Sequence, residues 1–282
     1  MTVSASLPAE VRPLFPAEAA RHLALATSLP AGRLIGSDEG DDATPVMWMS
    51  DGPAPAGLWE ALHRERQHSG LRPLLLAPLH DDREFRPWLS QELYPREMSS
   101  PAEHDAATLL RAAWEDVAVC RTDDPDEAEQ RSAITAPFGP SWPGQTPAPG
   151  SAVDADAHAR AYAARLLRGR PALRIGLVPA DNGAAALAAC GWSGPANHEK
   201  DIGRIAAVIG SWGQRFGAQV VCAGFDTLWL SIADPPTGVD EAHLAAAEHL
   251  AVCPDNILQG VGSLAVYAES LVGADSWTLW WD

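Results

Sequence analysis

The clearest hydrophobic pattern lies between positions 202 and 233, where its period changes within a short stretch. In the first half, apolar residues recur at steps of three and four, the spacing of one face of an α-helix; they are Ile202, Ile205, Ile209, Trp212 and Phe216. Asn197 or Asp201 can cap the start of this helix. Gly217 follows its last apolar residue, where a left-handed stop favours glycine. The pattern therefore predicts a helix that ends at Gly217.

Two strands are predicted directly after this helix. Residues 220–222 form a short apolar run that suits a buried strand, and residues 228–232 alternate in the period of two that is typical of a strand. Residues 224–226 are a turn candidate between them, and Pro235 and Pro236 cannot continue a ladder. Two strands joined by so short a turn pair antiparallel.

The rest of the C-terminal region continues this alternation. The patterns predict helices over 154–167, 182–190, 237–252 and 263–271, a strand over 173–179, and a final strand in which Trp277, Leu279 and Trp281 face inward. The main order is strand, helix, strand, strand, helix, strand. This is the order of a ferredoxin-like sheet with its helices on one face. The predicted class is therefore α+β, with tryptophans that mainly fill its interior.

The N-terminal half predicts a smaller α/β region, with helices over 17–28, 58–68 and 106–119 and strands over 33–36, 45–50 and 71–79. The segment 121–152 differs, because it is first acidic and then rich in proline, and such a composition buries little apolar surface. We therefore divide the chain into an N-terminal region (1–120), a linker or long loop (121–152) and a C-terminal domain (153–282). The middle segment can alternatively form a lid, and its Phe138 and Trp142 are expected to dock onto a domain.

Charge restricts the classes of partner. The chain of 282 residues has a formal net charge of −17. This field repels the phosphates of nucleic acids and the surface of an anionic membrane, whereas a basic protein partner is compatible with it. No apolar stretch approaches the length of about 18 residues that spans a bilayer, and the N-terminus shows no signal-peptide pattern. We expect no nucleic-acid partner, no membrane partner and a cytoplasmic location.

Several common sites have no matching motif. The four cysteines (Cys120, Cys190, Cys222 and Cys253) are far apart and form no C-x-x-C pair. The acidic run at 37–42 lacks the alternating ligands and closing glutamate of a calcium loop. Neither a G-x-x-x-x-G-K-[ST] loop nor a G-x-S-x-G turn is present. We therefore predict no cofactor and no metal site.

The strongest enzyme-like cluster lies at the end of a predicted helix and consists of Glu248, His249, Cys253 and Asp255. His249 and Cys253 are four residues apart, so they share a helix face. A His–Cys pair can make a thiolate nucleophile, with a carboxylate such as Asp255 orienting the imidazole. The same residues, with His243, could instead ligate a metal. The alternative is structural: a histidine that complements the helix dipole, a buried cysteine and an aspartate in a turn.

A second set of residues is predicted to form a binding surface: Trp212, Arg215, Gln259, Trp280 and Asp282. Trp280 and Asp282 share the face of the last strand opposite its inward residues. If that face is open, an aromatic ring and two carboxylates can meet a cationic group. The alternatives are that the tryptophans pack beneath helices and that Arg215 caps the carbonyls of its own helix.

Six spaced phrases resemble a known family. The chain is similar over about its last 110 residues to an actinobacterial family named domain of unknown function 4253, whereas the N-terminal half resembles the region that often precedes this domain. The resemblance implies no established activity and no site residues. The phrases are LVPA (177–180), GW (191–192), SWGQRFGA (211–218), ADPP (233–236), AEHLAVCPDNILQG (247–260) and WTLWWD (277–282).

These observations leave the function unknown and support two hypotheses. The first is a non-catalytic cytoplasmic protein-interaction module, including an immunity-type role that neutralises a basic partner. The abundance of tryptophan, which is enriched at binding hot spots, favours it. The second is a hydrolase or transferase that uses His249, Cys253 and Asp255.

Overall fold

The strands of both halves of the chain form one mixed sheet. The structure, a computed structural model, describes residues 6–39, 45–80, 84–118, 125–150 and 153–282. Within these residues the strand order is β1-β2-β4-β3-β5-β6-β7, and all neighbours are antiparallel except the parallel pair β3/β5. The strands are β1 (Gly32–Ile35), β2 (Met47–Ser50), β3 (Leu71–Leu76), β4 (Arg174–Pro179), β5 (Gln219–Ala223), β6 (Thr227–Ser231) and β7 (Ser276–Trp280).

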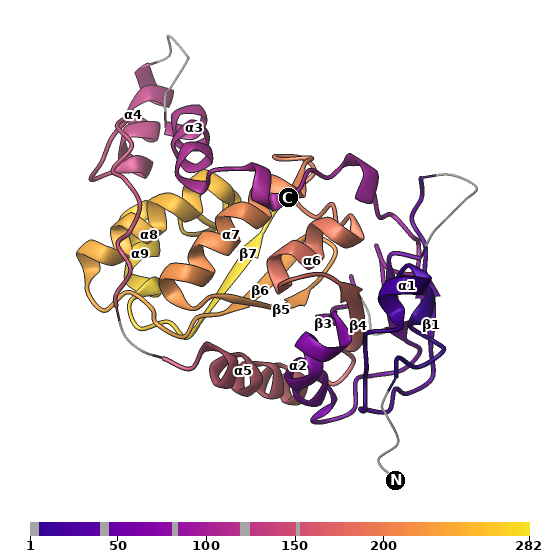
Figure 1. The fold of residues 1–282 in the computed structure, drawn as a ribbon. Helices are drawn as coiled ribbons and strands as arrows, with labels where there is room; N and C mark the ends of the chain where they lie inside the picture. The colour runs from indigo at the N-terminus through magenta and orange to yellow at the C-terminus, as the bar shows by residue number, and fades with distance from the viewer. Residues whose placement is uncertain (1–5, 40–44, 81–83, 119–124, 151–152) are drawn as a thin grey trace.

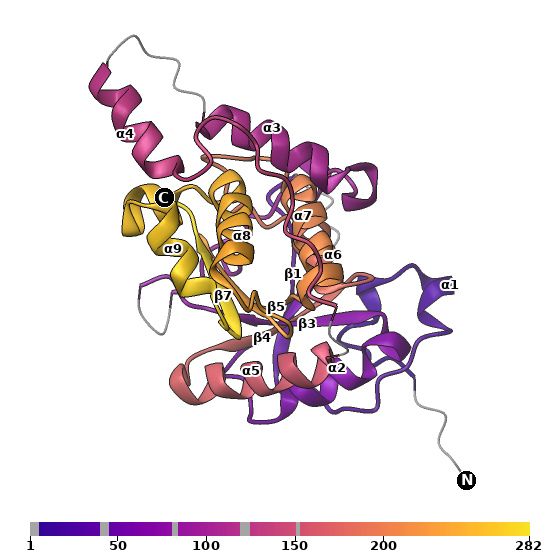
Figure 2. The same cartoon turned by 90° about the vertical axis from the view of Figure 1, so that its left-hand side faces the viewer.

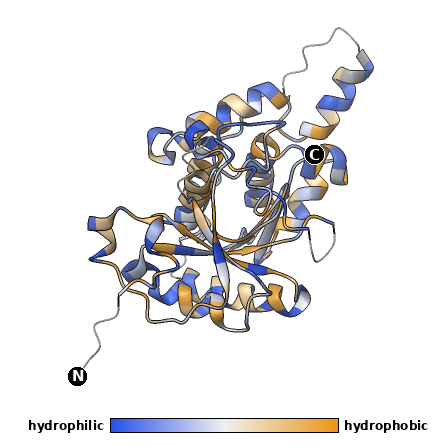
Figure 3. Cartoon of the chain, turned by 90° about the vertical axis from the view of Figure 1, so that its right-hand side faces the viewer, coloured by the Kyte–Doolittle hydropathy of each residue, from blue (hydrophilic) through white to orange (hydrophobic). Residues whose placement is uncertain are grey.

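Helices cover both faces of this sheet (Figures 1 and 2). One face carries α3 (Ala106–Ala118), α6 (Gly183–Cys190), α7 (Ile202–Phe216), α8 (Val239–Val252) and α9 (Leu264–Leu271). The other carries α2 (Leu58–Ser69) and α5 (Ala155–Gly169). The remaining helical elements are α1 (Ala17–Ala20), α4 (Pro125–Thr135), the short turns η1 (Arg12–Leu14), η2 (Pro95–Glu97) and η3 (Pro101–Glu103), and the π-helix η4 (Asn256–Val261). Figure 3 shows hydrophobic and hydrophilic residues alternating along the helices, as amphipathic packing requires.

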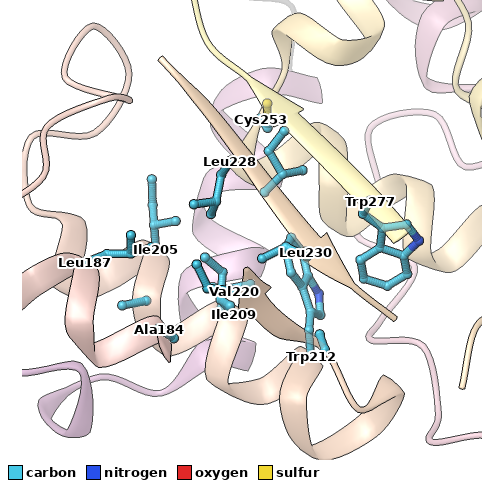
Figure 4. Packing of buried hydrophobic residues seen from close by; sticks show 14 of the residues in the cluster. Ala184, Leu187, Ile205, Ile209, Trp212, Val220, Leu228, Leu230, Cys253 and Trp277 are labelled. Carbon is cyan, nitrogen blue, oxygen red and sulfur yellow. The ribbon is translucent and has the colours of Figure 1, made fainter. Parts of the chain in front are cut away.

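The predicted helix and strand pair at 202–233 is confirmed. Asp201 caps α7 by accepting a hydrogen bond from the backbone of Gly203, and Gly217 ends it with a φ of 60°. All five apolar residues of the predicted helix face are buried, and β5 pairs antiparallel with β6. In Figure 4, Ile209 and Trp212 of α7 lie against Val220 and Leu230 of these strands.

The tryptophans mainly fill the interior, as predicted. Trp277, Leu279 and Trp281 are buried on one face of β7 and its end, whereas Thr278 on the other face is exposed. The largest side chains with less than 2% exposure include Trp48, Trp59, Trp88, Trp114, Trp192, Trp212, Trp277 and Trp281. Burial of these large rings adds to the hydrophobic driving force for folding.

One detail of the predicted architecture differs from the structure. The order of elements from β4 to β7 matches the prediction, but the ferredoxin-like arrangement is not confirmed, because β3 lies between β4 and β5. The helices between β4 and β7 do share one face, as predicted, whereas α2 and α5, which precede β4, pack on the opposite face. The hydrophobic pattern of a segment determines whether it forms a helix or a strand, but it does not determine which distant strand pairs with it.

The segment between the two halves is more ordered than its composition predicted. It contains α4, and the stretch 136–150, here called the strap, runs over the helical layer (Figure 1). The rings of Phe138 and Trp142 dock against Trp114, with centroids 6.4 and 5.8 Å away, as expected. The helix predicted at 17–28 is shorter, because α1 ends at Ala20. The acidic run at 37–42 lies partly outside the described residues. The domain boundaries at 120 and 153 stay a prediction.

Candidate functional site

Glu248 forms a buried ion pair rather than part of a catalytic cluster. Its side chain is fully buried, and Arg215 Nη1 and Nη2 donate to its two oxygens at 2.7 and 2.6 Å. Trp212 Nε1 and the backbone N–H of Thr146 also donate to this carboxylate, each at 2.7 Å. Arg215 in turn donates to the backbone oxygen of Thr146 at 2.8 Å. This pair therefore joins α8, α7 and the strap.

His249 is fully buried in a box of aromatic rings. Its ring centroid is 4.9 Å from Trp212, 4.5 Å from Trp277 and 5.6 Å from Tyr267. Nδ1 hydrogen-bonds the Tyr267 hydroxyl at 2.9 Å, and Nε2 is buried without a partner. Burial lowers the pKa of His249 to about 3, so the ring is neutral at pH 7.

The turn after α8 holds the end of the chain in place. Asn256 donates from Nδ2 to Thr278 O at 2.7 Å, and its Oδ1 accepts from the N–H of Trp280 at 3.0 Å. The Cys253 thiol donates to Trp280 O at 2.9 Å, and Asp255 accepts from the N–H of Asp282 at 2.9 Å. We call Cys253, Asp255 and Asn256 the C-terminal clasp. It binds backbone groups of Thr278 and Trp280 in β7, an edge strand, and so shields that part of the edge from further pairing.

The clasp also explains the charge state of Asp255. Burial raises its pKa, but the hydrogen bonds from the Asp282 backbone and Gln259, and the contact with His198 Nε2 at 2.7 Å, outweigh this effect and lower the pKa overall. Burial raises the pKa of Cys253 to about 12. A thiol with so high a pKa is a poor nucleophile at neutral pH.

The four predicted catalytic residues do not hydrogen-bond one another directly, although Asn256 contacts Cys253 and donates to the Tyr267 hydroxyl that bonds His249. His249 bonds Tyr267 and Cys253 bonds the Trp280 carbonyl, while Glu248 bonds Arg215. Among the described residues, no group of three or more His, Cys, Asp or Glu side chains is arranged to hold a metal ion. Catalysis by this cluster stays a prediction that the contacts do not favour.

We predict that Cys190, Cys222 and Cys253 will be unreactive in the folded protein. All three are buried, and burial raises the pKa of Cys190 and Cys253 to about 12 and that of Cys222 still higher. Ellman's reagent at pH 8, followed by peptide mapping, should modify these thiols at least about 100 times faster in the protein unfolded in guanidinium than in the native protein. Rapid labelling of Cys253 in the native protein would restore the nucleophile hypothesis.

The residues of the predicted binding surface fall into two groups. Trp212 and Arg215 are held inside the molecule by Glu248. Gln259 and Asp282 are exposed and both bond Asp255, and the half-buried Trp280 is tied to the clasp through its backbone. Only the second group lies where a partner can reach it.

A pocket of about 460 Å³, lined in part by charged and polar side chains, lies between α2, α5 and α7. We call it the arginine pocket, after Arg66 and Arg72, which line it with His63, Asp156, Asn182 and Gln219. These residues are far apart in sequence, so no local motif marks them. The available signal was Gly210, Gly213 and Gly217 on one side of α7, a stretch without side chains that also lines the pocket.

The clasp joins two of the phrases on which the family resemblance rests, CPDN and WTLWWD. Residues 174–282 match the model of the family described as Domain of unknown function (DUF4253). The predicted family is thus confirmed for the C-terminal domain, while an actinobacterial origin stays a prediction. Searches of curated proteins and of solved structures gave no match.

The DUF4253 region contains the clasp and the Arg215–Glu248 pair, but its strands are not adjacent throughout. It begins at β4, and β3 from the preceding region separates β4 from β5. The arginine pocket is likewise shared, since α2, β3 and the start of α5 line it together with α6 and α7. Within the described residues, no helix is long and apolar enough to cross a membrane.

Proposed function

We propose that this protein is a non-catalytic cytoplasmic binding module whose C-terminal end docks a basic protein. The supporting observation is a set of exposed apolar side chains beside the clasp. Leu258 and Val261 on η4 and Val266 on α9 are 36%, 49% and 52% exposed. Gln259 and Asp282 of the predicted binding surface are exposed too, and both hydrogen-bond Asp255 of the clasp. We call these five residues the docking surface.

Charge supports a basic partner. No lysine or arginine follows Arg215. The acidic residues of the stretch 216–282 are Asp226, Asp234, Asp240, Glu241, Glu248, Asp255, Glu269, Asp275 and Asp282. Cations from elsewhere reach some of them, since Arg165 pairs with Asp275 and His198 contacts Asp255. An apolar patch on a stretch of chain whose formal charges are all negative favours a partner with a basic rim by electrostatic complementarity. An immunity-type role, in which the partner is a basic toxin, is the specific form of this proposal.

The enzyme alternative has weaker support, because it needs a reactive thiol. Cys253 donates to a carbonyl and is buried, and His249 is bonded to Tyr267 instead. The thiol-labelling measurement described above is the test of this alternative.

The docking surface can be tested by co-purification at native expression levels. The bait is the full chain, and the variants are Val261→Arg and Val266→Arg. Both add a cation to the surface and should reduce recovery of a basic protein at least about tenfold, because like charges at an interface repel. Leu89→Arg is the matched control, since Leu89 is also exposed (39%) but lies in the N-terminal half. Equal recovery with all baits, or recovery of no basic protein, would contradict the proposal.

A further inference from the structure

The arginine pocket lies outside the docking surface and has a binding geometry of its own. One side is formed by α7, which lines it with Gly210 and Gly213 as well as with Ile209 and Gln214. A Cβ added at Gly210 would meet nothing within 4 Å, and one at Gly213 would meet only the backbone oxygen of Ala218, at 3.2 Å. The resulting space of about 460 Å³ is in the range of sites for small molecules.

The opposite wall of the pocket is a fixed network around Asp156. Gln219 Nε2 donates to Oδ1 at 2.9 Å, and Arg66 Nη2 donates to Oδ2 at 2.5 Å. His63 Nε2 lies 3.2 Å from Oδ1. Burial raises the pKa of Asp156, but these hydrogen bonds outweigh it and lower the pKa to about 2. Asp156 and Arg66 are therefore both charged and balance one another, so this wall is complete without a ligand.

Arg72 is the group of the pocket that has unused hydrogen-bond donors. It lies near the start of β3, the central strand of the sheet, and its Nη2 donates to the backbone oxygen of Asp181. Its Nε and Nη1 atoms are buried and have no hydrogen-bond partner. Burial, and then the charge of Arg66, lower its pKa, yet a guanidinium keeps its proton in proteins. Buried donors without acceptors cost free energy, and an acceptor that reached them would recover it.

Two neighbours set the chemistry of that acceptor. The pocket is lined by Asn182, Gly183 and Ala184 at the N-terminus of α6, where the helix dipole favours negative charge. The carboxylate of Asp181 also lines the pocket, but this residue is exposed and its charge is screened by water. A guanidinium beside a helix N-terminus is suited to a planar or tetrahedral oxyanion.

We propose that the arginine pocket binds a small organic anion, whose carboxylate or phosphate group accepts hydrogen bonds from Arg72. The rest of the ligand lies along the side of α7 formed by Gly210 and Gly213, beside the amide of Gln214. The site needs residues from both halves of the chain. It is independent of the docking surface, because the two share no residue.

The test uses the full chain and four probes at constant ionic strength: inorganic phosphate, glycerol 3-phosphate, succinate and, as the neutral control, glycerol. Calorimetry and thermal unfolding should show that a phosphate or carboxylate probe binds with a Kd of about 1 mM or lower, and that glycerol does not bind. A preference between the phosphate and carboxylate probes identifies the anionic group.

Two pairs of variants locate the site. Arg72→Gln should weaken binding of the anionic probe about tenfold or more, because it removes the charged donor. Arg64→Ala, on the exposed side of α2, should leave the Kd unchanged. Gly210→Leu fills the space but keeps every charge, so it should abolish binding, whereas Gly210→Ala should bind within about twofold of the wild type.

Three results would overturn the proposal. They are failure of every anionic probe to bind, binding by Arg72→Gln that equals the wild type, and unchanged binding by Gly210→Leu. Circular dichroism of each variant checks that the fold is retained. If Arg72→Gln does not fold, the Gly210 pair still decides the outcome.

Discussion

Replacement of Glu248 by alanine is expected to lower the free energy of unfolding by about 3–5 kcal/mol, the range for removal of one partner of a buried ion pair. The substitution leaves Arg215, whose side chain is only 13% exposed, without a counterion. It also removes the acceptor of Trp212 Nε1 and of the Thr146 N–H. The strap should loosen at the same time, because Thr146 is held by both members of the pair.

Chemical denaturation at pH 7 measures this effect, with hydrogen exchange at Thr146 reporting on the strap. Asp240→Ala is the matched control, since Asp240 is an exposed carboxylate in the first turn of the same helix and should cost less than about 1 kcal/mol. A loss for Glu248→Ala no larger than for this control would show that the buried pair contributes nothing to stability.

A double substitution separates the charge from the hydrogen bonds. Arg215→Met combined with Glu248→Leu removes both charges at similar volume, and such replacements are often neutral or stabilising. Here recovery should be incomplete, because Trp212 and Thr146 still lose their acceptor. A double variant as unstable as Glu248→Ala alone would assign the whole effect to those two hydrogen bonds.

Local contacts explain which parts of the fold could be predicted from the sequence. The helix at 202–216 and the strands after it were predictable because their signal is local, with Asp201, Gly217 and a regular apolar spacing within one stretch. The position of β3 between β4 and β5 was not, since it brings in a strand from about 100 residues earlier. No periodicity within either segment encodes that pairing.

The polar residues were harder for a related reason. Glu248, His249, Cys253 and Asp255 have side chains suited to catalysis, and their spacing is compatible with it. Their hydrogen-bond partners, however, are Arg215, Tyr267, Trp280 and the end of the chain, and only the three-dimensional structure shows this. The arginine pocket could not be predicted from the sequence, because His63, Arg72 and Asp156 are each ordinary in their local context and come together only in the fold.

Acid should destabilise this protein steeply below pH 6.5, and His249 should account for much of the effect. The ring is fully buried against the rings of Trp212, Trp277 and Tyr267, and burial lowers its pKa from 6.5 to about 3. The unfolded chain therefore binds a proton more readily than the folded one between these values. The stabilisation is complete above about pH 6.5 and is lost as the pH falls towards 3.

The measurement compares His249→Phe with the wild type at several pH values. Phenylalanine keeps the aromatic packing, and the Tyr267 hydroxyl still accepts from Asn256 Nδ2 at 2.9 Å. Between pH 7 and pH 4 the variant should lose roughly 3 kcal/mol less unfolding free energy than the wild type, at 1.36 kcal/mol for each pH unit of the shift.

His63, whose pKa burial and Arg66 lower to about 4, should keep a residual slope in this variant. His22→Gln is the control, since His22 is exposed, and its pH profile should match the wild type. If His249→Phe shows the wild-type slope, the buried imidazole takes up its proton without unfolding, and the aromatic box must admit charge or water.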